Sequence, residues 1–284
     1  MSRKGIMLCY PFEEKRLSKW QTPYFIQPKL DGERCRAVFG DNKKVTLLSS
    51  EENVFEYIPH INKELEKLNL AGLEFDGELY THGMTFEEIA SIAGRTVNPH
   101  QRFFDLEYHI FDVRIGKLTQ AKRADLLYSL KRLIEDAGVK SVRVVETTTV
   151  STKDEVLSYF DKVVSQGYEG FILREKSNIY IPRRSTQMMK FKPKKQDLYT
   201  IVGYQEEVSI YGEPKGTLGA LICESPQNPG EKFNVGTGFS ADQRRDLWVE
   251  KEGLVGKFVL VKYQHITPGR GVPRFPVFAE IVNV

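Results

Sequence analysis

The spacing of apolar segments changes at about residue 196 of the 284-residue chain. From there, five short apolar segments follow one another in under 90 residues, and turn-rich stretches separate them. They read YTIVGYQ, GALICES, EKFNVGTG, KFVLVKYQ and FAEIV. Short strands at this close spacing predict a small β-barrel of the OB type for residues 196–284.

The longer part of the chain, residues 1–195, mixes predicted strands with predicted helices. Strand-like segments over Tyr24–Leu48 are interrupted by turn signals at Asp31-Gly32 and Gly40–Asn42. Apolar residues recur at helical spacing over Thr119–Ala137. Further strands are predicted at 73–80 and 107–113, and further helices at 57–68, after the capping residue Thr85, and at 151–165. We therefore expect an α+β domain over residues 1–195, followed by the OB-fold domain.

Composition restricts the class of protein further. Hydrophobic residues make up 40% of the chain and charged residues 28%, which is typical of a globular protein. Apolar runs stay well below the roughly 18 residues that a membrane span needs, so we expect a cytoplasmic protein without a membrane partner. The three cysteines, Cys9, Cys35 and Cys223, are scattered, and we expect neither a disulfide nor a zinc site.

Positive charge is concentrated in the longer part. Residues 197–284 hold nine basic and eleven acidic side chains, whereas residues 1–196 hold 32 and 27. The segment RRSTQMMKFKPKK, Arg183–Lys195, has six basic residues and no acid. It indicates either a solvated basic face or a surface that binds phosphate groups.

The sharpest local signal is the segment KLDGER, Lys29–Arg34, between two predicted strands. A lysine attacks phosphorus only as the neutral amine, whereas its unperturbed pKa is about 10.4. We expect the nearby cations Lys190 and Lys192, together with a bound metal, to favour that neutral form. The alternative is a turn with solvated charges.

Five segments together resemble the covalent nucleotidyltransferases, specifically the compact ATP-dependent DNA ligases. KLDGER resembles motif I of that family, and the other four follow in the family's order. They are FDGELY (Phe75–Tyr80, motif III), YHIFDV (Tyr108–Val113, motif IIIa), EGFILR (Glu169–Arg174, motif IV) and KFKP (Lys190–Pro193, motif V). The resemblance implies a nucleotidyltransferase domain, with ATP-grasp-like mixed antiparallel sheets and helices, before the OB-fold barrel.

The resemblance also implies roles for individual residues. Lys29 carries AMP, Arg34 and Glu78 hold the ribose, and Asp31 orients Lys29 or a metal-bound water. Glu78 and Glu169 suit Mg²⁺ or Mn²⁺, because hard cations prefer carboxylate oxygens beside phosphates. The alternative for both acids is an exposed position on a strand.

The base and the phosphates have their own candidates. Phe111 stacks on adenine in this scheme, or else is a core aromatic. Gln27 contacts the adenine amino group through its amide oxygen, or else is an ordinary strand residue. Lys190 and Lys192 alternate with Phe191, so both ammonium groups lie on one face of a strand and can hold the phosphates of ATP.

The implied reaction uses ATP as the donor of AMP and acts on nicked duplex DNA as a monomer. AMP passes from Lys29 to the DNA 5′-phosphate, and the 3′-hydroxyl then displaces it. The rival hypotheses are an RNA ligase, a guanylyltransferase that caps RNA, and a non-catalytic nucleic-acid binder. The intact set of lysines and carboxylates argues against the last.

Two departures from the family pattern stand out. Family members usually carry an arginine after the strand that follows motif I, where this chain has Leu48–Glu51. The basic element of motif VI is also missing at the carboxyl end. Lys262, Arg270 and Arg274, in a Gly/Pro-rich segment, are the candidates to replace it and to contact DNA. The alternative for this segment is a flexible basic hairpin.

Overall fold

The computed structural model divides the chain into two compact units, Met1–Lys192 (unit 1) and Pro193–Val284 (unit 2). Within the described parts of both units, no helix is long and apolar enough to cross a membrane. The structure describes residues 5–192, 195–209, 211–226, 228–236, 238–263, 266–267, 269–273 and 276–282.

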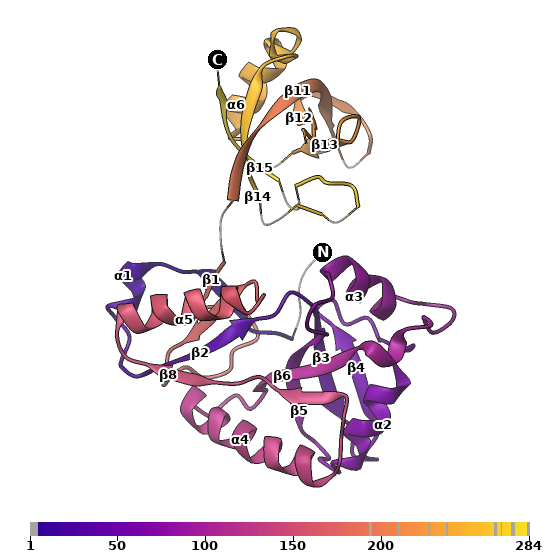
Figure 1. The fold of residues 1–284 in the computed structure, drawn as a ribbon, viewed down its shortest axis with the longest axis vertical. Coiled ribbons are helices and arrows are strands. Elements are labelled where there is room, and N and C mark those ends of the chain that lie inside the picture. The colour runs from indigo at the N-terminus through magenta and orange to yellow at the C-terminus, as the bar shows by residue number, and fades with distance from the viewer. Residues whose placement is uncertain are drawn as a thin grey trace. The chain divides into compact units, whose positions relative to one another are not determined.

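The first sheet of unit 1 has five strands in the order β1-β10-β9-β2-β8. Its neighbours are antiparallel except for the parallel pair β1 and β10. Helix α5 packs against β9, and Leu17 of α1 belongs to the same core cluster as residues of β2, β9 and β10; Figure 1 labels both helices. The bounds are β1 Leu8–Pro11, α1 Glu14–Leu17, β2 Tyr24–Lys29, β8 Thr148–Val150, α5 Lys153–Ser165, β9 Gly170–Arg174 and β10 Arg184–Phe191.

The second sheet of unit 1 has the order β4-β3-β5-β6-β7. Only β6 and β7 pair in parallel. Helices α2, α3 and α4 contact this sheet and help to enclose the largest core (Figure 1). The bounds are β3 Glu33–Phe39, β4 Val45–Ser49, α2 Pro59–Lys67, β5 Glu74–Tyr80, α3 Phe86–Ala93, η1 Phe103–Asp105, β6 Glu107–Val113, α4 Gln120–Asp136 and β7 Val142–Val144.

Strand alternation decides which side chains of this sheet reach the core. Phe75 and Leu79 of β5, with Tyr108 and Ile110 of β6, are buried among the core residues. Since successive side chains point to opposite faces, the polar residues between them project from the other face. That face carries the acidic residues of the FDGELY segment.

A buried ionic network joins β6, α4 and β9. Asp112 accepts hydrogen bonds from Arg123 Nε at 2.7 Å and from Arg174 Nη1 at 2.6 Å, and all three side chains are almost fully buried. Gln120 Oε1 accepts from Arg123 Nη2 at 2.7 Å. The single carboxylate thus pairs with two guanidinium groups, and it fixes the end of β6 against β9.

Unit 2 is built on one five-stranded antiparallel sheet in the order β13-β12-β11-β14-β15. The described strands leave β13 and β15 at the edges, so the predicted barrel is an open, OB-like sheet in this part of the chain. The bounds are β11 Lys195–Val208, β12 Pro214–Glu224, β13 Lys232–Val235, α6 Ala241–Val249, η2 Lys251–Leu254, β14 Phe258–Tyr263 and β15 Val277–Val282.

The predicted α+β fold is confirmed, with helices and strands close to their expected bounds. Helix α3 begins after Thr85, whose hydroxyl and the side chain of Glu88 form a capping box. Seven elements were not predicted. Strands β1, β7 and β8, helix α1 and the short helices η1 and η2 are only three or four residues long, and helix α6 buries no residue, so neither type leaves a clear apolar pattern.

Arg123→Ala tests the buried network. The variant removes one of the two guanidinium groups that pair with the buried Asp112 carboxylate. We expect this to lower the free energy of unfolding by about 3 kcal/mol or more. Urea denaturation followed by circular dichroism measures this loss. Arg132→Ala, at an exposed position on the same helix, is the matched control and leaves the midpoint nearly unchanged. Equal midpoints for the two variants would contradict a structural role for the network.

Candidate active site

Lys29 and Glu169 meet where β2 and β9 run side by side. Lys29 is the last residue of β2 and pairs in register with Gly170, and the Glu169 N–H donates to the Lys29 carbonyl at 3.2 Å. The Lys29 ammonium forms an ion pair with Glu169 Oε2. Lys192 Nζ donates to the other oxygen, Oε1, at 3.0 Å. One mostly buried carboxylate therefore joins the candidate nucleophile to a second lysine.

Two glycines allow the backbone segments of the site to approach so closely. A Cβ at Gly32, in the turn after Lys29, would lie 2.2 Å from the Leu79 carbonyl oxygen. At Gly170 the φ angle is +155°, and a Cβ would lie 2.0 Å from the Phe191 carbonyl oxygen. Both positions exclude any larger residue. Close contact with neighbouring backbone therefore explains why the KLDGER and EGFILR segments have glycine at these positions.

The electrostatic surroundings of Lys29 favour its charged form. Burial lowers the pKa of Lys29, but the carboxylates of Glu169 and Glu78, with Asp31 adding to them, outweigh burial and raise it overall. Burial likewise raises the pKa of Glu169, yet Lys29 and Lys192 outweigh it and the pKa falls. The protein's own charges therefore do not favour the neutral amine, contrary to the expectation for Lys190 and Lys192, because the charge nearest to Lys29 is a carboxylate.

The surroundings of Lys190 disfavour its charged form. Burial lowers the pKa of Lys190, and the positive charges of Lys29 and Lys192 lower it further. It precedes Phe191, which points away and stacks on Phe171 with ring centroids 5.3 Å apart. The alternation expected for the KFKP segment thus brings Lys190 and Lys192 close to Lys29, while Pro193 lies outside the described residues.

Glu78 and Arg34 lie opposite each other on neighbouring strands, at the register position where β3 meets β5. Burial raises the pKa of Glu78 to about 7, although Arg34 and Lys29 act against it. Arg34 donates through Nε and Nη2 to Asp76, at 2.7 and 2.6 Å, and through Nη2 to the Met7 carbonyl at 3.2 Å. These bonds fix the guanidinium beside Glu78.

Phe111 and Gln27 lie close together, and arginine side chains already contact both of them. The guanidinium of Arg34 is centred 4.5 Å from the Phe111 ring, and that of Arg174 is 5.5 Å away. Gln27 is buried and donates to the Phe111 carbonyl at 3.1 Å and to Thr147 Oγ1 at 2.9 Å. Its amide oxygen accepts from Arg174 Nε at 2.9 Å, which leaves one lone pair for an adenine amino group.

The residues proposed to contact DNA lie in unit 2. Lys262 is exposed on β14. Arg270 donates to Glu231 at 2.9 Å and to the Lys232 carbonyl at 2.9 Å, so its charge is partly neutralised. Arg274 lies outside the described residues.

The other departure from the family pattern is the segment Leu48–Glu51, at the end of β4. There the Ser49 hydroxyl accepts hydrogen bonds from the N–H groups of Glu51 and Asn53, and these bonds hold the turn.

Sequence reasoning missed the residues that position the site. Asp76 holds Arg34 and also accepts from Tyr180 at 2.6 Å, and Arg174 fixes the Gln27 amide. Asp76 and Asp112 both interrupt apolar strand segments, and a buried acid needs a partner. The sequence therefore indicated that both acids need partners. It did not indicate which residues these are, because the partners come from distant parts of the chain.

Glu169→Gln tests the electrostatic assignment of Lys29. Removing the carboxylate charge removes the strongest influence that raises the Lys29 pKa, so the pKa falls. The pH at which an amine-specific reagent modifies Lys29 at half its maximal rate then moves to a lower value. Peptide mass spectrometry measures the modification of Lys29. Glu135→Gln, at an exposed position on α4, is the control and leaves the profile unchanged. A profile that stays in place for Glu169→Gln would refute the ion pair.

Known proteins similar to this chain include viral and bacterial DNA ligases. A DNA ligase of African swine fever virus (isolate Warthog/Namibia/Wart80/1980) is 27% identical to the chain over 284 residues. The match covers 93% of this chain but only 65% of the relative, so the chain spans less than two thirds of that protein.

Two solved ligases match nearly the whole chain in structure. A Lig E DNA ligase, from a study of DNA binding with a minimal scaffold, gives a TM-score of 0.78 at 25% identity, covering 98% of this chain and 99% of its own. A Chlorella virus DNA ligase-adenylate gives 0.51 at 27% identity, covering 100% and 99%.

Family models cover both units of the chain. The model of the ATP dependent DNA ligase domain matches residues 6–192, which include every charged residue of the site in unit 1. The model of the DNA ligase OB-like domain matches residues 211–281. The first match alone exceeds half of the chain, and it ends at Lys192, the last lysine of the site. The chain belongs to the family of ATP-dependent DNA ligases.

Proposed function

We propose that this protein seals nicks in duplex DNA, using ATP as the donor of an AMP group that Lys29 carries. The observation that supports this proposal best is the cluster of Lys29, Glu169 and Lys192, with Glu78 close enough to influence the Lys29 pKa. A nucleic-acid binder has no need for a partly buried lysine that is paired with one carboxylate and lies near a second. In this proposal, residues 1–195 form the adenylyltransferase domain and residues 196–284 the OB-fold domain.

The nucleotide would lie along the charged face of the second sheet. The Phe111 ring offers a surface for adenine, and stacking there requires the Arg34 guanidinium to move or the base to use the rest of the ring. The remaining lone pair of the Gln27 oxygen suits the amino group of adenine and disfavours the carbonyl of guanine. Arg34 and Glu78 would hold the ribose hydroxyls.

The first step forms a bond between Lys29 Nζ and the α-phosphorus of ATP and breaks the bond to the departing pyrophosphate. Lys29 must first lose a proton, and Glu169, which already accepts from its ammonium, is the nearest acceptor. Lys190 and Lys192 then stabilise the charge that develops on the phosphates. Asp31, in the adjoining turn, helps to orient Lys29.

The later steps use the same phosphate pocket. AMP passes from Lys29 to the 5′-phosphate of the nick, which breaks the nitrogen–phosphorus bond and restores the free amine. The 3′-hydroxyl of the nick then attacks the same 5′-phosphate and expels AMP. Lys262, Arg270 and Arg274 are proposed to hold the DNA backbone during both steps.

A divalent metal ion fits the residues of this site. The carboxylates of Glu78 and Glu169 both influence Lys29, and they supply the hard oxygen atoms that Mg²⁺ or Mn²⁺ binds. The ion would offset carboxylate charge and so make the neutral form of Lys29 easier to reach. Within the described residues, no group of three or more His, Cys, Asp or Glu side chains is placed to hold a metal ion by itself, so phosphate oxygens would complete the coordination.

The proposal places the protein, as a monomer, in the cytoplasm of a bacterial cell or of a virus-infected host cell. The viral sources of two of its relatives support the second of these settings.

Lys29→Ala provides the direct functional test on a nicked duplex substrate. The variant loses sealing by at least about 10³-fold, because no other group replaces the nucleophile. Gel electrophoresis of an end-labelled nicked duplex measures this. Lys131→Ala, at an exposed position on α4, is the matched control and keeps full activity. Full sealing by Lys29→Ala would overturn the proposal.

Substrate preference separates this proposal from its rivals. The intact protein seals nicked DNA faster than nicked RNA, and it accepts ATP rather than GTP. Faster sealing of nicked RNA would identify an RNA ligase, and labelling by GTP alone would identify an RNA-capping enzyme. Tight DNA binding without any sealing would leave only the non-catalytic binder.

A further inference from the structure

Unit 1 has a cavity on the other side of the backbone that carries the candidate nucleophile. Its volume is about 550 Å³, within the range of small-molecule sites. Pro28 and Tyr168, which directly precede Lys29 and Glu169, line it. Neighbouring side chains on an extended chain point to opposite sides, so the cavity and the charged cluster share two backbone segments but face apart.

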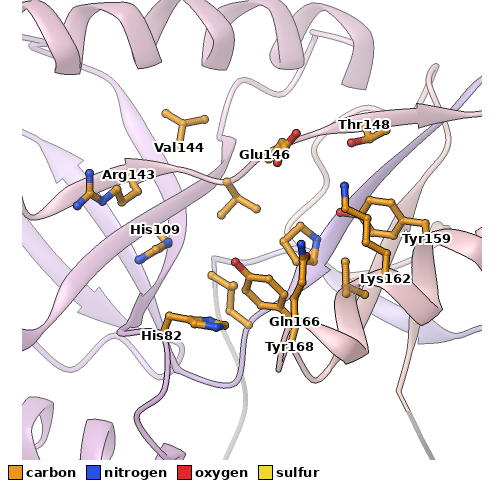
Figure 2. A pocket seen from close by; sticks show the side chains of 14 residues that line it. His82, His109, Arg143, Val144, Glu146, Thr148, Tyr159, Lys162, Gln166 and Tyr168 are labelled. Carbon is orange, nitrogen blue, oxygen red and sulfur yellow. The ribbon is translucent and has the colours of Figure 1, made fainter.

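A cluster of aromatic rings forms one wall of this cavity. The rings of His82 and Tyr168 have centroids 4.9 Å apart. His82 Nδ1 and the Tyr80 hydroxyl are hydrogen-bonded at 2.8 Å, and Tyr80 packs edge-on against His109 at 5.2 Å. His82, His109 and Tyr168 all line the cavity (Figure 2). These contacts hold the rings in place, so they offer a preformed surface for a flat ligand.

Cationic groups lie at both ends of the cavity. In Figure 2, Arg143 lies at one end with His109, and Lys162 lies at the other end with Tyr159. Arg143 is held through Nε and Nη2 by Glu107, at 3.2 and 2.9 Å. A basic side chain at the rim of an aromatic cavity suits a phosphate, through charge-assisted hydrogen bonds.

One acidic side chain, Glu146, lies among these lining residues between the two ends (Figure 2). Its carboxylate accepts hydrogen bonds only, so it suits an amino group on the ligand. Burial raises the pKa of Tyr159, and the negative charge of Glu146 raises it further. The Tyr159 hydroxyl therefore stays protonated and donates.

We propose that this cavity binds a mononucleotide with an amino-bearing base, such as AMP, separately from the nucleotide that reacts at Lys29. The base lies against Tyr168 and His82, its amino group reaches Glu146, and the phosphate meets Lys162. The site goes beyond the proposed function and does not depend on it. An occupant that presses on Pro28 and Tyr168 also affects the positions of Lys29 and Glu169.

Equilibrium dialysis with labelled AMP tests this site on protein first converted to its adenylate with ATP and Mg²⁺. Covalent AMP then fills the first site, and the second site still binds AMP. Lys162→Gln weakens this binding by about tenfold, the effect of one lost charge-assisted hydrogen bond. Lys131→Gln, at an exposed position on α4, leaves it unchanged.

A second variant and two smaller probes complete the test. Gln166→Trp fills the cavity from an exposed position and abolishes the binding, while the thermal unfolding midpoint stays unchanged. Adenosine and inorganic phosphate each bind more weakly than AMP, because each lacks half of the contacts. Inorganic phosphate that binds as tightly as AMP would overturn the aromatic part of the proposal. Adenylated protein that binds no AMP would overturn all of it.

Failure of the proposed function is distinguishable from failure of this inference. Intact-mass measurement shows directly whether the adenylate has formed. Should none form, dialysis of the unreacted protein still applies, and Lys162→Gln then weakens one of two classes of AMP site while Gln166→Trp removes it. Unreacted protein whose AMP binding is insensitive to both Lys162→Gln and Gln166→Trp would contradict the second site.

Discussion

The ion pair between Lys29 and Glu169 is the interaction on which the rest of the site depends. It forms because β2 and β9 are neighbours in one sheet, and because Gly170, at the start of β9, lets the end of β10 approach closely. The pair keeps Lys29 as an ammonium ion until another charge replaces that of Glu169. In the proposed reaction, arriving ligands would therefore control when Lys29 becomes a nucleophile.

The surrounding network explains how a mixed fold holds this pair in place. Asp112 fixes Arg174, Arg174 fixes the amide of Gln27, and Gln27 bridges to the Phe111 carbonyl. The chain of contacts connects the two sheets of unit 1 through fully buried polar groups. Each group is satisfied by a partner on a different element, so Gln27 and Phe111 keep their positions only while the whole core is folded.

The sequence was informative where one segment carries a complete signal. The alternation in Lys190–Lys192 was sufficient to predict which face each side chain occupies, and the Thr85 cap marked a helix start. It was uninformative where a property depends on long-range partners. The raised pKa of Lys29 arises from Glu169 and Glu78, and neither lies near it in the chain. The cavity behind Lys29 likewise draws its lining from separate segments, including β6, β7 and α5.

The central claim is that Lys29 is the residue that carries AMP. After incubation with ATP and Mg²⁺, proteolysis at neutral pH and tandem mass spectrometry locate the added group. The account predicts AMP on the peptide that contains Lys29, with fragment ions that assign it to the Lys29 side chain. An adenylate on Lys190, on Lys192 or on any other residue would contradict it, as would protein that stays unmodified.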